Sequence, residues 1–271
     1  MKSLVLKDRT ITTERPAFIM GVVNANENSF YEKSRGGLER CLSLIEDGVD
    51  ILDIGSESSR PGAVYISEEE ESEKIIGLVK KVRKFSDIPI SIDTRKKSVF
   101  EKAYNEGADI LNDISALEDD KNMASYIAQI DVPVVLMHKR GEPLTMQNNT
   151  HYENAFLEVN EYLLGRISFA LDCGIKKEKI IIDPGFGFGK DFSANKMLLE
   201  KCDLLCGGEY NLLIGLSRKS FIGEMTGKDV SDRLIGTIVC NIIAVQKGAS
   251  ILRVHDVKEC ADSLNVLKYF L

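Results

Sequence analysis

Short apolar runs that stop at a polar residue recur along this chain. Three of them share one pattern: GVDILD at Gly48–Asp53, GADILN at Gly107–Asn112 and GASILR at Gly248–Arg253. Each begins with a glycine suited to the left-handed conformation that ends a helix, continues as an apolar strand, and stops at a polar side chain. The pattern predicts a repeated unit in which a strand follows a helix.

The other apolar runs extend this reading to eight strands, separated by segments with helical spacing. Strands that alternate with helices indicate a parallel sheet, and eight such units in about 250 residues favour a (β/α)8 TIM barrel over a doubly wound sheet. We therefore predict an α/β barrel. Its strands are expected at Phe18–Val23, Asp50–Ile54, Pro89–Ile92, Asp109–Leu111, Val132–Met137, Lys179–Ile182, Leu212–Leu216 and Ser250–Val254.

Two local patterns add detail at the ends of the barrel. Leu4–Leu6 and Thr10–Thr13 predict a hairpin that plugs the N-terminal end of the barrel. Ser67 with Glu70 forms the signature of a capping box at the start of a helix. The acidic run Glu68–Glu71 is expected to be the solvated first turn of that helix.

Composition narrows the classes of function. The 271 residues are 44% hydrophobic and contain no evident linker, so residues 1–271 are expected to form one barrel domain. The formal net charge of -7 argues against a general nucleic-acid or membrane surface, although a local pocket for a small anion remains compatible with it. Leu234–Val245, the longest apolar region, is too short to span a bilayer, and the N-terminus lacks the apolar stretch of a signal peptide. We expect a soluble, cytoplasmic protein.

The six cysteines are scattered and include no CxxC pair. Cys202 and Cys206 are four residues apart, a spacing more typical of one helix face than of half a metal site. We expect all six to be reduced thiols of the core.

Polar side chains follow every predicted strand. In a barrel these strand ends meet on one face, which is where active sites of this fold lie. Each residue alone is also a good turn or cap former, as Asp93 before Thr94 illustrates. The mixture of acids and amides at some ends with cations at others predicts a pocket with an acceptor side and an anion side. The residues at the eight ends are Asn24; Glu57, Ser59 and Arg60; Asp93; Asn112 and Asp113; His138; Asp183; Ser217, Arg218 and Lys219; and Arg253 and His255.

Several of these ends lie in motifs that together resemble the ordered signature of the dihydropteroate synthase family. The resemblance runs from about Phe18 to the C-terminus, and the family's fold is the barrel that the strand pattern predicts. The motifs are SIDT at Ser91–Thr94, LND at Leu111–Asp113, LMH at Leu136–His138, IDPGFGFGK at Ile182–Lys190, GLSRKSFIG at Gly215–Gly223 and RVHDV at Arg253–Val257; DIGSESSRPGA at Asp53–Ala63 resembles the family's second loop.

The resemblance implies a reaction in folate biosynthesis. In it, 6-hydroxymethyl-7,8-dihydropterin diphosphate condenses with 4-aminobenzoate, releasing diphosphate and forming 7,8-dihydropteroate. Departure of diphosphate leaves a resonance-stabilised cation at the pterin methylene, so catalysis would consist mainly of stabilising the leaving anion and shielding the cation from water. The same resemblance implies a homodimer that is a target of sulfonamides.

The resemblance also implies roles for single residues. A buried carboxylate such as Asp183 can accept two N–H groups of a pterin, each charge-assisted bond contributing roughly 1.5–3 kcal/mol. Arg253 and His255, two apart on one strand end, would meet diphosphate oxygens together. The residues that match are Asp93, Asn112, Asp183 and Lys219 for pterin; Asn24, Ser59, Arg253 and His255 for diphosphate; Phe30, Ser59, Arg60, Pro61, Phe188 and Ser220 for aminobenzoate; and Lys219, Asp93, Arg253 and His255 for catalysis.

Asn24 matches the family's metal contact as well. Mg²⁺ needs few protein ligands where a diphosphate supplies oxygens. The glycines of Gly185–Lys190 fit neither nucleotide-loop pattern and are expected to let the backbone fold near the ligand. His138 is interpreted either as a pocket residue or as a structural one.

The first loop departs from the family. The usual N-x-T-P-D-S-F here reads Asn24-Ala25-Asn26-Glu27-Asn28-Ser29-Phe30, without the proline and the aspartate. Loss of the proline frees the backbone, so we expect loop closure to be less favourable and aminobenzoate binding to be weaker. Two alternatives to the synthase stay open: a methyltetrahydrofolate:corrinoid methyltransferase, which shares the pterin pocket but holds no diphosphate, and a pterin-binding protein without turnover.

The loop hypothesis predicts the behaviour of a triple variant, Asn26→Thr with Glu27→Pro and Asn28→Asp. Restoring the usual loop centre should lower the KM for aminobenzoate, because a stiffer loop loses less entropy on closing. Steady-state kinetics of the variant against the parent chain measure this, and an unchanged KM would remove the hypothesis.

Overall fold

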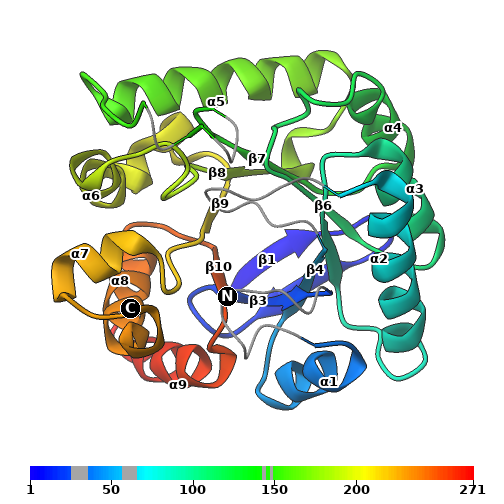
Figure 1. Cartoon of the computed structure of the whole chain (residues 1–271), viewed down its shortest axis with the longest axis horizontal. Helices are drawn as coiled ribbons and strands as arrows, with labels where there is room; N and C mark the ends of the chain where they lie inside the picture. The colour runs from blue at the N-terminus through cyan, green and yellow to red at the C-terminus, as the bar shows by residue number, and fades with distance from the viewer. Residues whose placement is uncertain (26–35, 57–65, 142–144, 147–148) are drawn as a thin grey trace.

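Eight parallel strands close into a barrel, as the sequence predicts. We used a computed structural model, which describes residues 1–25, 36–56, 66–141, 145–146 and 149–271. The strands follow one another around the barrel in chain order, and helices surround them (Figure 1). The strands are β3 Phe18–Asn24, β4 Ile51–Gly55, β5 Ile90–Asp93, β6 Ile110–Asp113, β7 Val134–Met137, β8 Ile180–Asp183, β9 Asn211–Ile214 and β10 Ile251–Val254.

The helices bury one face each against the outside of the barrel, where the larger of two apolar clusters lies. Their bounds are α1 Leu38–Glu46, α2 Glu68–Arg83, α3 Lys97–Asn105, α4 Met123–Ile130, α5 Ala155–Asp172, α6 Phe192–Lys201, α7 Ser220–Thr226, α8 Leu234–Gln246 and α9 Val257–Leu267. Short 3₁₀ turns lie at Lys177–Lys179, Cys202–Gly208 and Val230–Asp232.

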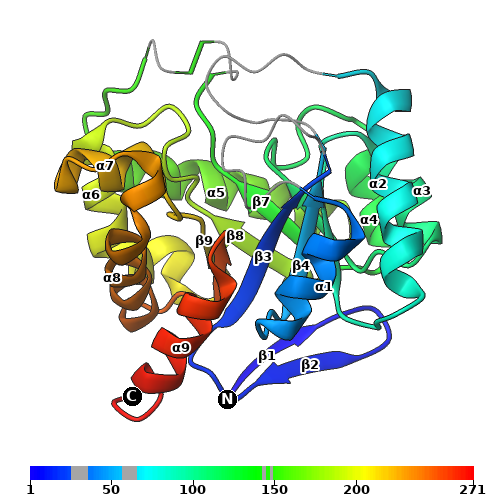
Figure 2. The ribbon, with the colours of Figure 1, turned by 60° about the horizontal axis from the view of Figure 1, so that its bottom comes forward.

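The predicted N-terminal hairpin is present and closes the floor of the barrel. Strands β1 (Lys2–Val5) and β2 (Thr10–Thr13) pair antiparallel, and Figure 2 shows them beneath the barrel. Leu4 and Leu6 are buried in a cluster with residues from inside the barrel. Lys179 Nζ donates to the Leu6 carbonyl oxygen at 2.8 Å, which fixes the hairpin to the start of β8.

Inside the barrel the side chains lie in layers. Alternate strands contribute four isoleucines to the smaller apolar cluster, and two residues further along the same strands the side chains are polar. The other four strands contribute a further layer, which lies in register between the isoleucines and the polar residues. It contains Met20, Val135 and Leu213, with Ser91 as its polar member. The isoleucines are Ile51, Ile110, Ile181 and Ile251; the polar residues above them are Asp53, Asn112, Asp183 and Arg253.

The start of α2 confirms one expectation and corrects another. Ser67 Oγ accepts a hydrogen bond from the Glu70 backbone N–H at 3.2 Å, which is the predicted cap. Glu71, however, is buried rather than solvated and forms an ion pair with Lys96 at 2.6 Å. Glu71 is four residues before Ile75 and so lies on the buried stripe of the helix.

The cysteines are free thiols, and five of the six are buried. Cys202 and Cys206 do not share a helix face, because the segment kinks and Cys206 has a left-handed φ of 49°. Among the described residues, no three His, Cys, Asp or Glu side chains gather as a metal site. In the same residues no helix is both long and apolar enough to cross a membrane.

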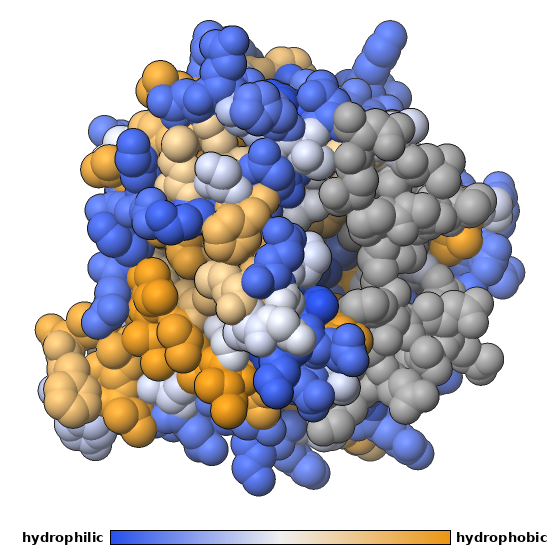
Figure 3. All heavy atoms as spheres, turned by 60° about the vertical axis from the view of Figure 1, so that its left-hand side comes forward, coloured by the Kyte–Doolittle hydropathy of each residue, from blue (hydrophilic) through white to orange (hydrophobic). Residues whose placement is uncertain are grey.

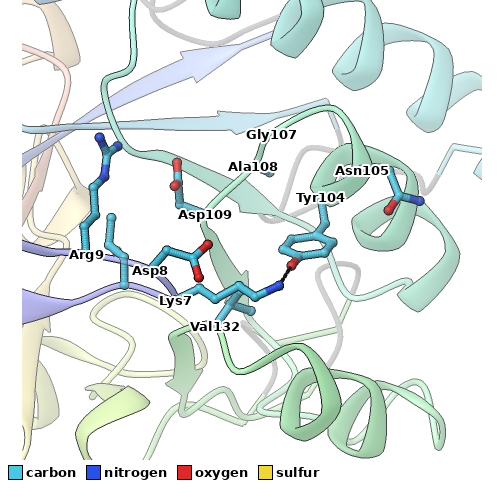
Figure 4. Close-up of a pocket in the computed structure, with 10 residues that line it drawn as sticks. Lys7, Asp8, Arg9, Tyr104, Asn105, Gly107, Ala108, Asp109 and Val132 are labelled. Atoms are coloured by element: carbon cyan, nitrogen blue, oxygen red, sulfur yellow. Dashed lines mark hydrogen bonds between the residues drawn. The ribbon is translucent and has the colours of Figure 1, made fainter.

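One cavity, of about 410 Å³, lies at the N-terminal end of the barrel, between the hairpin turn and the segment joining α3 to β6. Figure 4 shows Lys7 directed at Tyr104 across it, and the two are hydrogen-bonded. Arg9 donates to the Asp87 carbonyl oxygen at 2.5 Å. Both cations of this cavity therefore already have partners, and the cavity is remote from the polar layer.

Candidate active site

The polar layer is centred on the guanidinium group of Arg253. Its Nε donates to Asp53 Oδ2 and its Nη2 to Asp93 Oδ2, both at 2.7 Å. Burial alone would lower the pKa of Arg253, but the carboxylates of Asp53 and Asp93 outweigh it and raise the pKa. Arg253 is thus a permanent cation bound by two acids from neighbouring strands.

Asp53 also binds the carboxamide of Asn112. Asn112 Nδ2 lies 3.3 and 3.2 Å from the two carboxylate oxygens of Asp53. Sequence reasoning missed Asp53 as a site residue, since it looked only at the loop that follows β4. The signal was available: Asp53, Asn112 and Arg253 are the polar residues that end the three related fragments.

Lys219 and Asp183 form the second charged pair of the site. Lys219 Nζ donates to the Phe186 carbonyl oxygen at 2.6 Å and lies 4.7 Å from the centre of the Phe188 ring. Burial lowers the pKa of Lys219 to about 8, against the attraction of Asp183. Burial raises the pKa of Asp183, which accepts from the Gly185 N–H at 2.7 Å, while Lys219 opposes that rise.

His255 is oriented by Ser217. The Ser217 hydroxyl lies 2.9 Å from His255 Nδ1 and accepts from the His255 backbone N–H at 3.2 Å. Arg40 Nη2 donates to the His255 carbonyl oxygen at 2.7 Å. The imidazole at the end of β10 is therefore held by the loop after β9.

Three polar strand-end residues have structural partners instead of facing the site. Arg218 has a left-handed φ of 57°, is buried, and binds both oxygens of Asp256 at 2.7 and 2.9 Å. Asp113 accepts from the Ser115 and Leu117 N–H groups at 2.8 Å, and burial raises its pKa to about 6. These contacts fix the loops after β9 and β6.

His138 is the third of these residues and is structural. Its Nδ1 lies 2.8 Å from Lys190 Nζ, and burial lowers the pKa of the imidazole far below its usual value. Lys190 is itself buried and donates to the Gly185 and Phe188 carbonyl oxygens at 2.8 and 3.1 Å. The pair holds the glycine-rich loop in place.

Close packing of the backbone requires glycine at two positions of that loop, Gly185 and Gly189. A Cβ atom on Gly185 would lie 1.9 Å from the His138 carbonyl oxygen, and one on Gly189 would lie 2.4 Å from that of Arg140. Both glycines also have left-handed φ angles, 67° and 64°. Gly187 lies beside Lys219 and the Gly185 N–H donates to Asp183, so both of these glycines also border the site.

The residues proposed for the second substrate fall largely outside the described part of the chain. Phe30, Ser59, Arg60 and Pro61 lie there, as does the altered loop centre, Asn26–Asn28. Phe188 is half-buried beside Lys219, Ser220 is the exposed first residue of α7, and Asn24 is the last residue of β3.

The arrangement suits a ligand with donors at one end and an anion at the other. Asp183 and Asn112 supply acceptors on β8 and β6. Lys219 and Arg253 supply the cations, and Arg253 makes no hydrogen bond through Nη1 to the described part of the chain. A buried acceptor wall beside two cations is the charge pattern that the sequence predicted.

Comparison with known proteins gives one consistent result. A family model described as pterin binding enzyme matches residues 20–255. The chain is 42% identical over 253 residues to a dihydropteroate synthase of Haemophilus influenzae, covering 92% of each chain. A crystal structure of the Yersinia pestis dihydropteroate synthase with a sulfonamide drug complex superposes with a TM-score of 0.93 at 33% identity, covering 99% of both chains. The Xanthomonas albilineans enzyme in complex with 7,8-dihydropteroate gives 0.87 at 35% identity, covering 99% of this chain and 98% of that one.

Proposed function

The chain belongs to the pterin-binding enzyme family, among its dihydropteroate synthases, and we propose that the polar layer above the barrel isoleucines is where its reaction takes place. The chain condenses 6-hydroxymethyl-7,8-dihydropterin diphosphate with 4-aminobenzoate to give 7,8-dihydropteroate and diphosphate. The observation that carries the proposed site is the Arg253 guanidinium bound to Asp53 and Asp93. Through these bonds Arg253 on β10 is joined to β4 and β5, and the strands that carry the acceptor wall, β6 and β8, lie between them around the barrel.

The pterin would bind along that wall. Asp183 is an acceptor that Gly185 already orients, and it would receive N–H donors of the aminopyrimidinone ring. Asn112 and Asp93 would make the other polar contacts. Lys219, directed inward by the Phe186 carbonyl oxygen, would hold the pterin from the side of β9 and keep it in register.

The diphosphate would bind at the end of β10. Arg253 and His255 alternate along this strand and would stabilise negative charge as the bond from the pterin methylene to the diphosphate oxygen breaks. Phe188 and Lys219 lie together at the mouth of the site, where Ser220, with Phe30, Ser59, Arg60 and Pro61, would receive the aminobenzoate. The arylamine nitrogen then forms the new bond to the methylene carbon.

A magnesium ion fits this site only as a partner of the substrate. The described residues offer no cluster of acids for a metal, whereas one carboxamide oxygen at Asn24 suits a hydrated ion that takes most of its ligands from diphosphate and water. Asn24 would hold it. Bound Mg²⁺ would supply positive charge to the leaving group.

The site assignment predicts the loss of both products in two variants. Protein with Mg²⁺ and the pterin diphosphate should release diphosphate and form dihydropteroate together when 4-aminobenzoate is added. Asp183→Asn or Lys219→Ala should lower the rate roughly 100-fold or more, since each removes a charged contact to the substrate. Removal of Mg²⁺ by a chelator should also slow both products.

The matched control is Asp262→Asn, which changes an exposed acid on α9 and should leave the rate unchanged. Product formation that survives Asp183→Asn would refute the pterin assignment. Binding of the pterin diphosphate without any dihydropteroate would favour a protein that binds but does not turn over.

Lys219 should also make substrate binding depend on pH. Its pKa of about 8 lies below the usual 10.5, so the ammonium is present below pH about 8 and is lost as the pH rises through that value. The affinity for the pterin diphosphate should therefore fall on the alkaline side. Lys219→Arg keeps its charge to a higher pH, so the affinity of this variant for the pterin diphosphate should begin to fall at a higher pH. Both proteins bind the same substrate, which removes the substrate's own titration from the comparison; identical profiles would exclude Lys219 as the titrating group.

We further propose that two copies of the chain pair through α8. Ile235, Val239 and Ile243 are 77%, 51% and 38% exposed at a spacing of four residues, and so form one apolar stripe. Figure 3 shows apolar side chains gathered on the side of the molecule where α7, α8 and α9 lie. Sedimentation should give a dimer that Ile235→Lys converts to a monomer and that Leu157→Lys, on α5, leaves intact. A monomeric parent chain would rule the proposal out.

A further inference from the structure

Asp53 is buried with no exposed surface, yet it is bonded to two residues of the proposed site. Its carboxylate accepts from Arg253 Nε at 2.7 Å and from Asn112 Nδ2 at 3.2 and 3.3 Å. It lies two residues above Ile51 on β4, one layer below the strand ends. It therefore touches the residues that would bind the substrate without being placed to touch the substrate itself.

The chemistry of these bonds fixes the orientation of the Asn112 side chain. A carboxylate only accepts hydrogen bonds, so the carboxamide must turn its NH₂ group toward Asp53. Its carbonyl oxygen Oδ1 then faces away from Asp53 and makes no hydrogen bond with the described part of the chain. The carboxamide of Asn112, which could lie either way round, is thereby fixed with its oxygen away from Asp53.

The bond to Arg253 fixes the cation in the same way. With Nε on Asp53 and Nη2 on Asp93, the plane of the guanidinium is set by two strands. Its remaining nitrogen, Nη1, is left for an anion. One buried carboxylate thus orients an acceptor and a cation that lie side by side in the proposed site.

We infer that Asp53 is a positioning residue that determines specificity, because it makes Asn112 present an acceptor and so selects a ligand with N–H donors at that point. This inference rests on the proposed function, in which Asn112 contacts the pterin. Asp53 acts through Asn112 and Arg253 and does not contact the substrate.

The variant Asp53→Asn should invert the selection. Its carboxamide oxygen would still accept from Arg253 Nε, so its NH₂ group would point at Asn112. Asn112 would then turn its oxygen toward position 53 and its NH₂ group toward the ligand, where a donor meets a donor. The dissociation constant for 6-hydroxymethylpterin, which carries no diphosphate, should rise at least about tenfold.

A swapped pair tests whether the cause is orientation or mere loss of structure. In Asp53→Asn with Asn112→Asp, the new asparagine donates to the new carboxylate, which still presents an oxygen to the ligand. Pterin affinity should return to within about threefold of the parent, although Asn112→Asp alone should bind poorly because it places two carboxylates together. If Asp53 had a purely structural role, the losses of pterin affinity in the two single variants would add in the double variant. Recovery of affinity in the double variant is the opposite result.

Ser91→Ala is the control for disturbance of the barrel interior. Ser91 is the register partner of Asp53 on β5, is buried, and has a hydroxyl without a hydrogen-bond partner in the described chain. Its removal should leave pterin affinity unchanged. Thermal unfolding of all four variants shows which of them fold, and only folded variants are compared.

The outcomes separate this inference from the proposed function. If the parent chain forms dihydropteroate, and Asp53→Asn binds 6-hydroxymethylpterin as well as the parent does, Asp53 has no positioning role while the function stands. Losses that add in the swapped pair would also overturn the inference. If the parent chain neither binds the pterin nor forms product, the proposed function fails first.

Discussion

The ion pairs of Arg253 are the constraint on which the rest of the site depends. A guanidinium this deep in a barrel is tolerated only with acids beside it, and Asp53 and Asp93 provide them at 2.7 Å. Removing either acid would leave a largely buried charge partly uncompensated, which is more costly than losing an exposed pair. Asp53 in turn orients Asn112, so the balance of charge in the layer and the shape of the pocket depend on the same residues.

The barrel accommodates these charges by stacking its inward side chains in layers. Alternate strands supply Ile51, Ile110, Ile181 and Ile251 to one layer, and two residues on they supply two acids, an amide and a cation to another. Below the isoleucines the hairpin residues Leu4 and Leu6 exclude water from the floor. The polar groups therefore rest on a dry, closely packed base. A dry base strengthens every electrostatic interaction above it.

The sequence predicted the barrel because each strand is short, apolar and followed by a polar residue. This pattern does not depend on which side chains contact one another in the folded chain. It predicted the polar ends as a group for the same reason. The strand pattern by itself did not separate Lys219 from Arg218, which are adjacent, and only the family resemblance singled out Lys219. The left-handed backbone at Arg218 turns that side chain to Asp256, whereas Lys219 points inward to Phe186. Nor could the sequence assign His138, whose role depends on Lys190, 52 residues away along the chain. Asp53 was missed because its partners come from β6 and β10.

The same charge balance explains why a cation from outside the layer is part of the proposal. Asp53, Asp93 and Asp183 contribute three formal negative charges, and Lys219 and Arg253 two positive ones, so the layer carries one negative charge before substrate enters. A diphosphate adds further negative charge, which these five residues cannot neutralise. The single N–H of Arg253 Nε is taken by Asp53 and one N–H of Nη2 by Asp93, so only the other Nη2 hydrogen and those of Nη1 remain for a diphosphate. Stabilising the leaving group would therefore draw on positive charge that arrives with the substrate or from the loops. In the proposed function a magnesium ion held by Asn24 would supply it without adding a buried cation to the empty barrel.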